Sequence, residues 1–333
     1  SYAPEISLKQ GVVMLGTSLF GLYFGSRYSI PDQLLLLARA LAFIIILSVL
    51  TVVLLPDYGV SHGVHFGNWR GVFTHKNHFG RFMALSVFVF LTLSRSRNRL
   101  AFKRARMWFG ISLLLVFLSG SETAIAATFI VLGLSPFLKV LRRPMKQLVG
   151  FGASALAVML FSAPILLRQV GTVLKLLGRD ATMSGRIFLW MGLGFRVLQR
   201  PWLGYGFEGF WSSDLVRPVW LLIGWTPGHA HDGFLELCLD LGIFGCAIFL
   251  GGFAVVAVRA RALLLKTPKS LESVWSRVFL LFFLVYNVPE CCLLVQNELF
   301  WVLFVGIATA LPLTQWRPNP AKPSFERGAE QCA

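Results

Sequence analysis

The chain has 333 residues, of which 56% are hydrophobic and only 14% charged, and its net charge is +16. A soluble domain carries about a quarter charged residues, so the composition excludes an ordinary soluble domain and indicates a membrane protein. The positive charge does not indicate nucleic-acid binding, because the basic residues fall in short groups between apolar runs and not along one polar face.

Apolar runs follow one another along most of the chain. A helix that crosses a membrane needs roughly 20 apolar residues, so we predict an all-α, polytopic transmembrane bundle of about nine spans. The fourth and fifth predicted spans are short, and Ser119 to Thr123 forms a tight turn between them. The predicted spans are 10–26, 34–55, 79–94, 107–119, 123–138, 147–167, 233–258, 274–290 and 293–313.

Basic residues between the spans predict the orientation of the bundle. They form four groups that lie on one side if the spans alternate, and the positive-inside rule makes that side cytoplasmic. The groups are Arg95, Arg97, Arg99, Lys103, Arg104 and Arg106; Lys139, Arg142, Arg143 and Lys146; Arg259, Arg261, Lys266 and Lys269; and Arg317, Lys322 and Arg327.

This topology divides the chain into four parts. They are N-terminal membrane helices at 1–167 with an outer loop at 56–78, a large outer loop at 168–232, C-terminal membrane helices at 233–313, and a cytoplasmic tail at 314–333. Because the chain starts with Ser1 and not Met, we expect a segment to precede it.

The large outer loop contains a helix signal of its own. Ser184 can cap a helix that runs to Gln199 and that Pro201, Gly204 and Gly206 terminate. We expect this helix to be amphipathic and to lie on the membrane surface. Its apolar stripe consists of Ile187, Phe188, Met191, Phe195 and Leu198.

All histidines fall on the outer side in this topology, and they are His62, His65, His75, His78, His229 and His231. Two His-x-x-His patterns allow a metal site, but we expect none, because no carboxylate follows at a spacing typical of catalytic metal sites. For His62 and His65 we prefer solvated loop positions. The cysteines Cys238, Cys246, Cys291, Cys292 and Cys332 have no metal or disulfide spacing either, and we expect them to pack as apolar residues.

His231 is the strongest candidate for chemistry, because it lies at the outer start of the span 233–258. Histidine can accept and return a proton near neutral pH. Asp232 and Glu236 follow it, and carboxylates at a membrane boundary are functional candidates by default. Asp232 could equally be a helix cap with no catalytic part.

Arginines at the outer boundary complete the candidate site. Arg70, Arg81 and Arg186 each present a rigid fork of donors that fits phosphate oxygens, and a pair of arginines can hold a diphosphate. A surface arginine that touches lipid phosphates is the plainer alternative for each of them. We favour the binding role most for Arg70 and Arg186, which glycines flank. His75, Lys76 and Asn77 would support them.

Four motifs follow one another along the chain. They are Trp69-Arg-Gly-Val-Phe-Thr-His-Lys-Asn-His-Phe-Gly80; Leu118-Ser-Gly-Ser-Glu-Thr-Ala124; Ser184-Gly-Arg-Ile-Phe-Leu-Trp190 with Pro201-Trp-Leu-Gly-Tyr-Gly206; and His229-Ala-His-Asp-Gly-Phe-Leu235 with Gly242. In these motifs the chain resembles the O-antigen ligase and polymerase family of bacterial envelope glycosyltransferases, and within it the succinoglycan-type exopolysaccharide polymerases. Two positions depart from the family pattern: Asp232 stands where Asn or Ser is commoner, and Glu122 where a basic residue is frequent.

The resemblance implies a C-type glycosyltransferase of the bacterial inner membrane with a periplasmic active face and no metal or nucleotide cofactor. The substrate would be an undecaprenyl-diphosphate-linked glycan, with His231 as catalytic residue and Arg186 and Arg70 as diphosphate binders. Membrane lipid, a flippase and a chain-length regulator are the expected partners. Polymerisation of repeat units is the favoured reaction; transfer to lipid A core, transfer to protein, and transport of an anionic substrate are the alternatives.

Overall fold

The computed structural model describes the whole chain except residues 64–65, 97, 149, 151–184 and 317–333. The proposed cap Ser184 and His65 therefore lie outside the described residues. The same holds for the predicted span 147–167 except residues 147, 148 and 150. The described residues are mainly helical, and they contain no strand apart from an isolated bridge between Val60 and Trp69.

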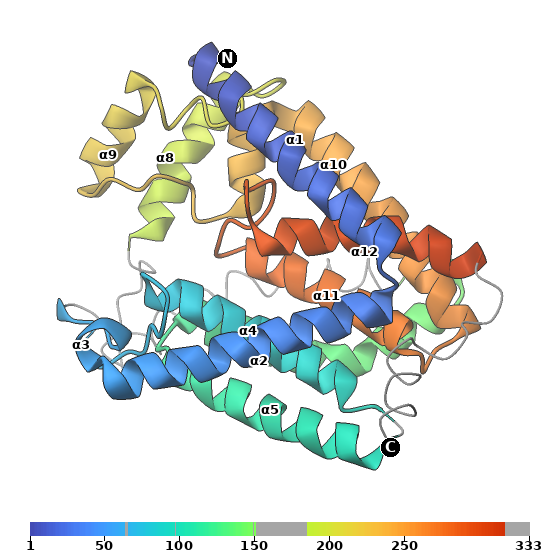
Figure 1. Ribbon diagram of the computed structural model, residues 1–333. Helices are drawn as coiled ribbons and strands as arrows, with labels where there is room; N and C mark the ends of the chain where they lie inside the picture. The colour runs from blue at the N-terminus through green and yellow to red at the C-terminus, as the bar shows by residue number, and fades with distance from the viewer. Residues whose placement is uncertain (64–65, 97, 149, 151–184, 317–333) are drawn as a thin grey trace. The chain divides into compact units, whose positions relative to one another are not determined.

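The helices follow the predicted order, with boundaries that differ in places (Figure 1). They are α1 (Pro4–Arg27), α2 (Ile30–Leu54), α3 (Pro56–Gly59), α4 (Lys76–Leu93), α5 (Arg99–Leu118), α6 (Glu122–Leu134), η2 (Ser135–Arg142), α8 (Arg186–Gln199), η3 (Asp214–Val216), α9 (Arg217–Ile223), α10 (Gly233–Lys266), α11 (Leu271–Asn287) and α12 (Leu299–Trp316).

Three helical stretches of the described chain are long and apolar enough to cross a membrane: Ile30–Leu54, Glu122–Arg142 and Gly233–Lys266. Leu299–Thr314 is a shorter apolar helix. The all-helical membrane architecture is thus confirmed, while the number of nine spans stays a prediction.

Helix α5 extends eight residues beyond the start of the predicted span 107–119, because the Asn98 side chain caps it by accepting from the Leu100 and Ala101 amides at 2.9 and 3.1 Å. One boundary prediction was wrong. The predicted span 293–313 begins in a loop, and its helix starts only at Leu299. Leu294 and Asn297 in that loop have positive φ angles of 52° and 56°, which a helix does not allow.

The chain divides into two compact units. The first holds Ser1–Val12 and Phe137–Gly251, and the second holds Val13–Pro136 and Gly252–Ala333. In the second unit, α4 packs against α5, α6, α11 and α2, with Phe79, Met83 and Phe88 fully buried on α4. The turn Ser119–Thr123 is confirmed, because α5 ends at Leu118 and α6 begins at Glu122.

In the first unit, α8 has apolar residues on two faces. Leu189 and Leu193 are buried in a cluster with Tyr205 and Phe210. The predicted stripe faces outward, with Phe188, Met191, Phe195 and Leu198 each at least half exposed. Gly185, with a left-handed φ of 81°, occupies the N-cap position that the sequence suggested for Ser184.

Helix α10 is broken at Gly242, where φ is 63° and ψ is −164°. A break in an apolar helix frees backbone groups that have no water to bond with inside a membrane. Here the segment Pro201–Gly206 supplies the missing partners. Tyr205 and Gly206 donate their N–H groups to the Leu239 and Asp240 carbonyls at 2.8 and 2.9 Å, and the Pro201 and Trp202 carbonyls accept from Ile243 and Phe244 at 2.7 and 3.3 Å.

Glycine is required on both sides of this junction. A Cβ atom at Gly242 would collide with the Trp202 carbonyl, and one at Gly204 would collide with the Leu239 carbonyl. Both residues also have positive φ. Two of the motifs noted in the sequence, Pro201–Gly206 and the one that ends at Gly242, are therefore the two halves of one junction.

Gly242→Ala should consequently destabilise the first unit. The positive φ alone costs about 1–3 kcal/mol in a residue with a side chain, and the collision with Trp202 adds to it. We expect a lower midpoint of thermal unfolding in detergent, followed by tryptophan fluorescence. Gly251→Ala, on the same helix with no neighbouring atom within 4 Å of the added Cβ, is the matched control and should leave the midpoint unchanged. Equal midpoints for the two variants would contradict the role given to Gly242.

Candidate active site

Asp232 caps helix α10. Its Oδ1 accepts hydrogen bonds from the Phe234 and Leu235 amides, both at 2.9 Å. These amides belong to the first turn of the helix, where backbone donors have no partner within the helix. Of the two roles that the sequence left open for Asp232, the structure thus provides direct contacts for the cap.

His231 lies immediately before this cap in a strained conformation. Its φ of 53° is in the left-handed region, which residues with a side chain rarely adopt. Its amide donates to His229 Nδ1 at 3.2 Å, and the two imidazole rings lie 4.0 Å apart between centroids. The Trp225 ring, from an earlier part of the same loop, lies 5.7 Å from the His231 ring between centroids. Strain of this kind persists only where the surroundings enforce it, and it is common at functional sites.

Glu236 is one of the groups that enforce this conformation. It is 9% exposed, and its two carboxylate oxygens accept hydrogen bonds from the Ala230 amide and from Trp211 Nε1. Its contact with Ala230 fixes the residue directly before His231. Neither Ala230 nor Trp211 was singled out from the sequence, because one is small and apolar and the other is one of several loop tryptophans.

A further hydrogen bond ties helix α8 to the same loop. Trp190 Nε1 donates to the Ala230 carbonyl at 2.9 Å, so both backbone groups of Ala230 are bonded. Arg186 precedes Trp190 by four residues and therefore lies on the same face of α8. Gly185, at the start of this helix, also lies close to Trp225, since a Cβ there would be 3.4 Å from Trp225 Nε1. The structure thus brings the beginning of the Arg186 helix to the loop that carries His231.

Two more carboxyl groups lie near Glu236 in this unit. Asp240, which is 4% exposed, accepts from the Glu208 amide at 3.1 Å through Oδ1. Burial raises the pKa of Glu208 above its usual range. Asp240 thereby helps to fix the loop that follows Pro201–Gly206. This role was not evident from the sequence, because Asp240 lies inside an apolar helix.

Arg70 belongs to the second unit. Its Nε donates to the Tyr58 carbonyl at 2.6 Å, its Nη2 donates to the Asp57 carbonyl at 3.4 Å, and its guanidinium lies 5.2 Å from the centre of the Tyr58 ring. These contacts hold Arg70 at the end of the short helix α3. A binding role for it stays a prediction from the sequence.

The predicted supporting residues His75, Lys76 and Asn77 make structural contacts at the start of α4. His75 Nδ1 caps the helix by accepting from the Asn77 amide at 3.2 Å. Lys76 Nζ donates to the Gly120 carbonyl at 3.0 Å, and Asn77 Nδ2 donates to Glu290 Oε1 at 3.5 Å. The residues therefore connect the start of α4 to the turn at Gly120 and to the loop that contains Glu290, all in the second unit.

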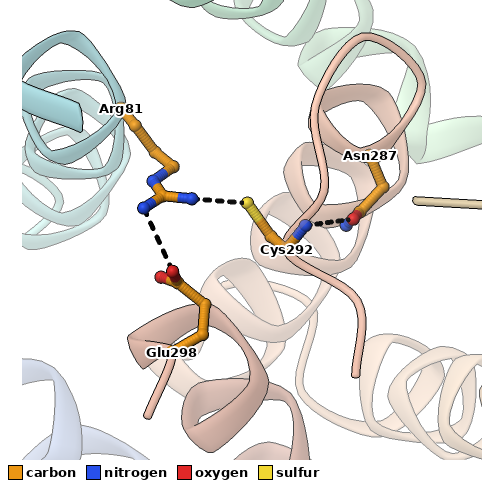
Figure 2. A network of polar contacts seen from close by, with 4 residues as sticks. All are labelled: Arg81, Asn287, Cys292 and Glu298. Carbon is orange, nitrogen blue, oxygen red and sulfur yellow. Dashed lines mark hydrogen bonds and ion pairs between the residues drawn. The ribbon is translucent and has the colours of Figure 1, made fainter. Parts of the chain in front are cut away.

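Arg81 is engaged inside the second unit (Figure 2). Its Nη2 forms an ion pair with Glu298 at 3.0 Å, and its Nη1 donates to Cys292 Sγ at 3.1 Å. The side chains of Arg81 and Glu298 are both only 11% exposed. The Cys292 amide in turn donates to Asn287 Oδ1 at 2.8 Å. These contacts anchor the loop between α11 and α12 to α4, and a diphosphate-binding role for Arg81 stays a prediction from the sequence.

Within the part of the chain that the structure describes, no group of three or more histidine, cysteine, aspartate or glutamate side chains is placed to hold a metal ion. The carboxyl groups of Glu236, Asp240 and Asp232 instead accept hydrogen bonds from backbone amides. Their arrangement can position an imidazole and an arginine-bearing helix beside each other.

The pKa of Asp232 predicts how the cap responds to pH. Burial raises this pKa from its ordinary value of about 3.9, although the Leu235 and Phe234 amides oppose the shift. A carboxyl group whose pKa is raised on folding contributes stability at low pH and loses it as the pH rises through the folded pKa. Asp232→Asn keeps an accepting oxygen but does not ionise, so its unfolding midpoint relative to the native protein should increase as the pH rises above about 4.

Asp232→Ala is the control for the cap itself. It should be less stable than Asp232→Asn by about 1 kcal/mol at every pH, because it has no side-chain oxygen. Midpoints measured by tryptophan fluorescence in detergent separate the two effects. A difference between native protein and Asp232→Asn that does not vary with pH would contradict the raised pKa.

Comparisons with known proteins agree with the family suggested by the motifs. The family described as O-Antigen ligase matches residues 107–250. The exopolysaccharide production protein ExoQ of Rhizobium meliloti is 23% identical over 266 residues, which cover 74% of this chain and 58% of that protein. A provisionally named polysaccharide ligase of Rickettsia prowazekii is 28% identical over 88 residues, or 23% of this chain and 20% of that protein. Residues 107–250 therefore match the O-antigen ligase family, and the chain is similar to an exopolysaccharide production protein and to provisionally named polysaccharide ligases.

Proposed function

We propose that the chain transfers a glycan from an undecaprenyl-diphosphate-linked donor at the periplasmic face of the bacterial inner membrane, and that it polymerises exopolysaccharide repeat units. The observation that carries the proposal is the hydrogen bond from Trp190 to Ala230, which joins the helix of Arg186 to the loop of His231. The name of the Rhizobium relative supports exopolysaccharide as the product.

In the proposed reaction, His231 acts as general base. It takes the proton from an acceptor hydroxyl while the hydroxyl oxygen attacks C1 of the donor sugar from the face opposite the diphosphate. The bond from C1 to the diphosphate oxygen breaks, and the configuration at C1 inverts. His231 then releases the proton to water. A positioned general base contributes on the order of 10²–10⁴-fold to the rate.

Arg186 would bind the diphosphate and stabilise the negative charge that develops on it as the C1 bond breaks. A guanidinium suits this task because its donors match two phosphate oxygens at once. A diphosphate-binding role for Arg70 is proposed from its sequence motif alone. Glu236 and Asp232 would act through the backbone, by holding the residues on either side of His231.

The external stripe of α8 supports a position at the membrane surface. Phe188, Met191, Phe195 and Leu198 are exposed on the helix that carries Arg186. An apolar helical face of this kind favours the boundary between lipid headgroups and tails. The diphosphate of a polyprenyl lipid lies at the same boundary, so the helix would present Arg186 at the level of its ligand. We retain a flippase and a chain-length regulator as proposed partners.

A ligase that delivers the glycan to lipid A core or to protein is the nearest alternative, and the Rickettsia relatives favour it by name. The match to the exopolysaccharide protein covers 74% of the chain against 23% for the first of those ligases, so we prefer polymerisation. Deletion of the gene should abolish secreted polysaccharide of high molecular weight. Loss of the ladder on lipopolysaccharide, with secreted polysaccharide intact, would instead establish the ligase.

A transporter for an anionic substrate is the alternative from another class. The break in α10 is a feature that transporters share, since they use free helix ends within the membrane to bind substrates. Here the segment Pro201–Gly206 occupies the backbone groups on both sides of the break. A substrate that bound to these four backbone groups would have to displace the segment, which favours the transferase.

His231→Ala should lower the rate at which the reconstituted protein elongates lipid-diphosphate-linked repeat units by on the order of 10²–10⁴-fold. Binding of the donor lipid should persist, because the diphosphate contacts come from arginines. The measurement is product length on gels of labelled glycan, with donor binding followed separately.

His62→Ala is the matched control, since His62 is an exposed histidine whose Nε2 lies 3.0 Å from the Asp57 carbonyl oxygen. It should elongate the glycan at the native rate. Arg186→Ala should weaken donor binding as well as turnover. Native product length with His231→Ala would refute the assignment of the base, and movement of label across liposomes without elongation would favour the transporter.

A further inference from the structure

Two cysteine thiols meet across the break in α10. Cys238 Sγ and Cys246 Sγ lie 2.8 Å apart, although eight residues separate them along the helix. In a straight α-helix, eight residues correspond to a rise of about 12 Å, too far for two cysteine side chains to meet. Gly242 lies midway between the two cysteines, and its φ of 63° produces the bend that brings the sulfur atoms together.

The two thiols are also accessible in part. Cys238 and Cys246 are both half-buried, whereas Cys292 is buried and bonded to Arg81. The spacing of the cysteines did not indicate a disulfide. In a regular helix, two cysteines that are eight residues apart lie too far from each other to form one. Only the broken backbone makes the pair possible.

We propose that Cys238 and Cys246 are a redox modification site, which forms an intrahelical disulfide across Gly242 when the protein meets a disulfide oxidant. The thiolate of one cysteine attacks the oxidant, forms a mixed disulfide and releases one thiol. The second cysteine attacks its partner's sulfur in that mixed disulfide and releases the other thiol. The two cysteines lose two protons and two electrons, and the oxidant is reduced to two thiols.

The disulfide would tie the part of α10 before Gly242 to the part after it. The part before Gly242 carries Glu236 and Asp240, which hold the loops around His231 and Glu208. In the reduced protein, the hydrogen bonds of Pro201–Gly206 maintain the junction. A disulfide adds a covalent tie at the same place. The inference concerns the thiols alone and does not depend on the proposed function.

The test uses the full chain purified in detergent and 4,4′-dithiodipyridine, an aromatic disulfide that can enter an apolar environment. After reaction, the protein is denatured, alkylated and analysed by mass spectrometry. We expect the peptide that contains both cysteines to lack two hydrogen atoms and to carry neither a pyridyl nor an alkyl group. Dithiothreitol should restore two thiols that can be alkylated.

Two variants serve as controls. In Cys246→Ser, Cys238 should keep the pyridyl group, because no second thiol can displace it. The double variant Cys291→Ser with Cys292→Ser should form the same cross-linked peptide as the native chain. Pyridyl groups on both cysteines, alkylation of both, or dimers linked through either one would overturn the proposal. Denatured native protein, in which the pair is separated, should give the pyridyl adducts and so verify the reagent.

Discussion

The first unit depends on the exchange of backbone hydrogen bonds between the broken helix α10 and the segment Pro201–Gly206. An interrupted helix in an apolar environment is stable only if other groups satisfy its free carbonyls and amides. The exchange uses donors and acceptors from both partners, on both sides of Gly242. Because the segment follows directly after α8, the same bonds fix where α8 ends. The position of Arg186 at the other end of that helix follows from them.

Around this junction, carboxyl side chains accept hydrogen bonds from backbone amides instead of facing solvent. Asp240 fixes the Glu208 amide, Glu236 fixes the Ala230 amide, and Asp232 caps the first turn of α10. Three carboxyl groups on a single helical stretch thus determine the course of the two loops beside it. Buried polar groups have this effect when each has a partner, because the alternative of leaving them unbonded costs considerable free energy. The strained φ of His231 is the visible result.

Much of the architecture could be predicted from the sequence, because apolar runs, basic groups and glycine motifs are local signals. The turn at Ser119–Thr123 and the helix that ends at Gln199 followed from such signals. The ion pair between Arg81 and Glu298 could not be predicted, since it joins residues more than 200 positions apart. The contact of Trp190 with Ala230 was hidden for the same reason, and the early start of α5 was missed because its first turns are basic. Local sequence patterns do not indicate which distant residues come into contact.

Helix α8 has a practical consequence for work on the segment that contains it. One of its faces is buried with Leu189 and Leu193, and the opposite side exposes Phe188, Met191, Phe195 and Leu198. Neither side is suited to water. An isolated fragment that comprised only residues 185–232 would lose the sections of α10 that cover the first face and the lipid that suits the second. Expression of this segment as a soluble domain would therefore produce aggregates. Antibodies should be raised against the whole chain, and crystals grown from it, in a lipid-like environment.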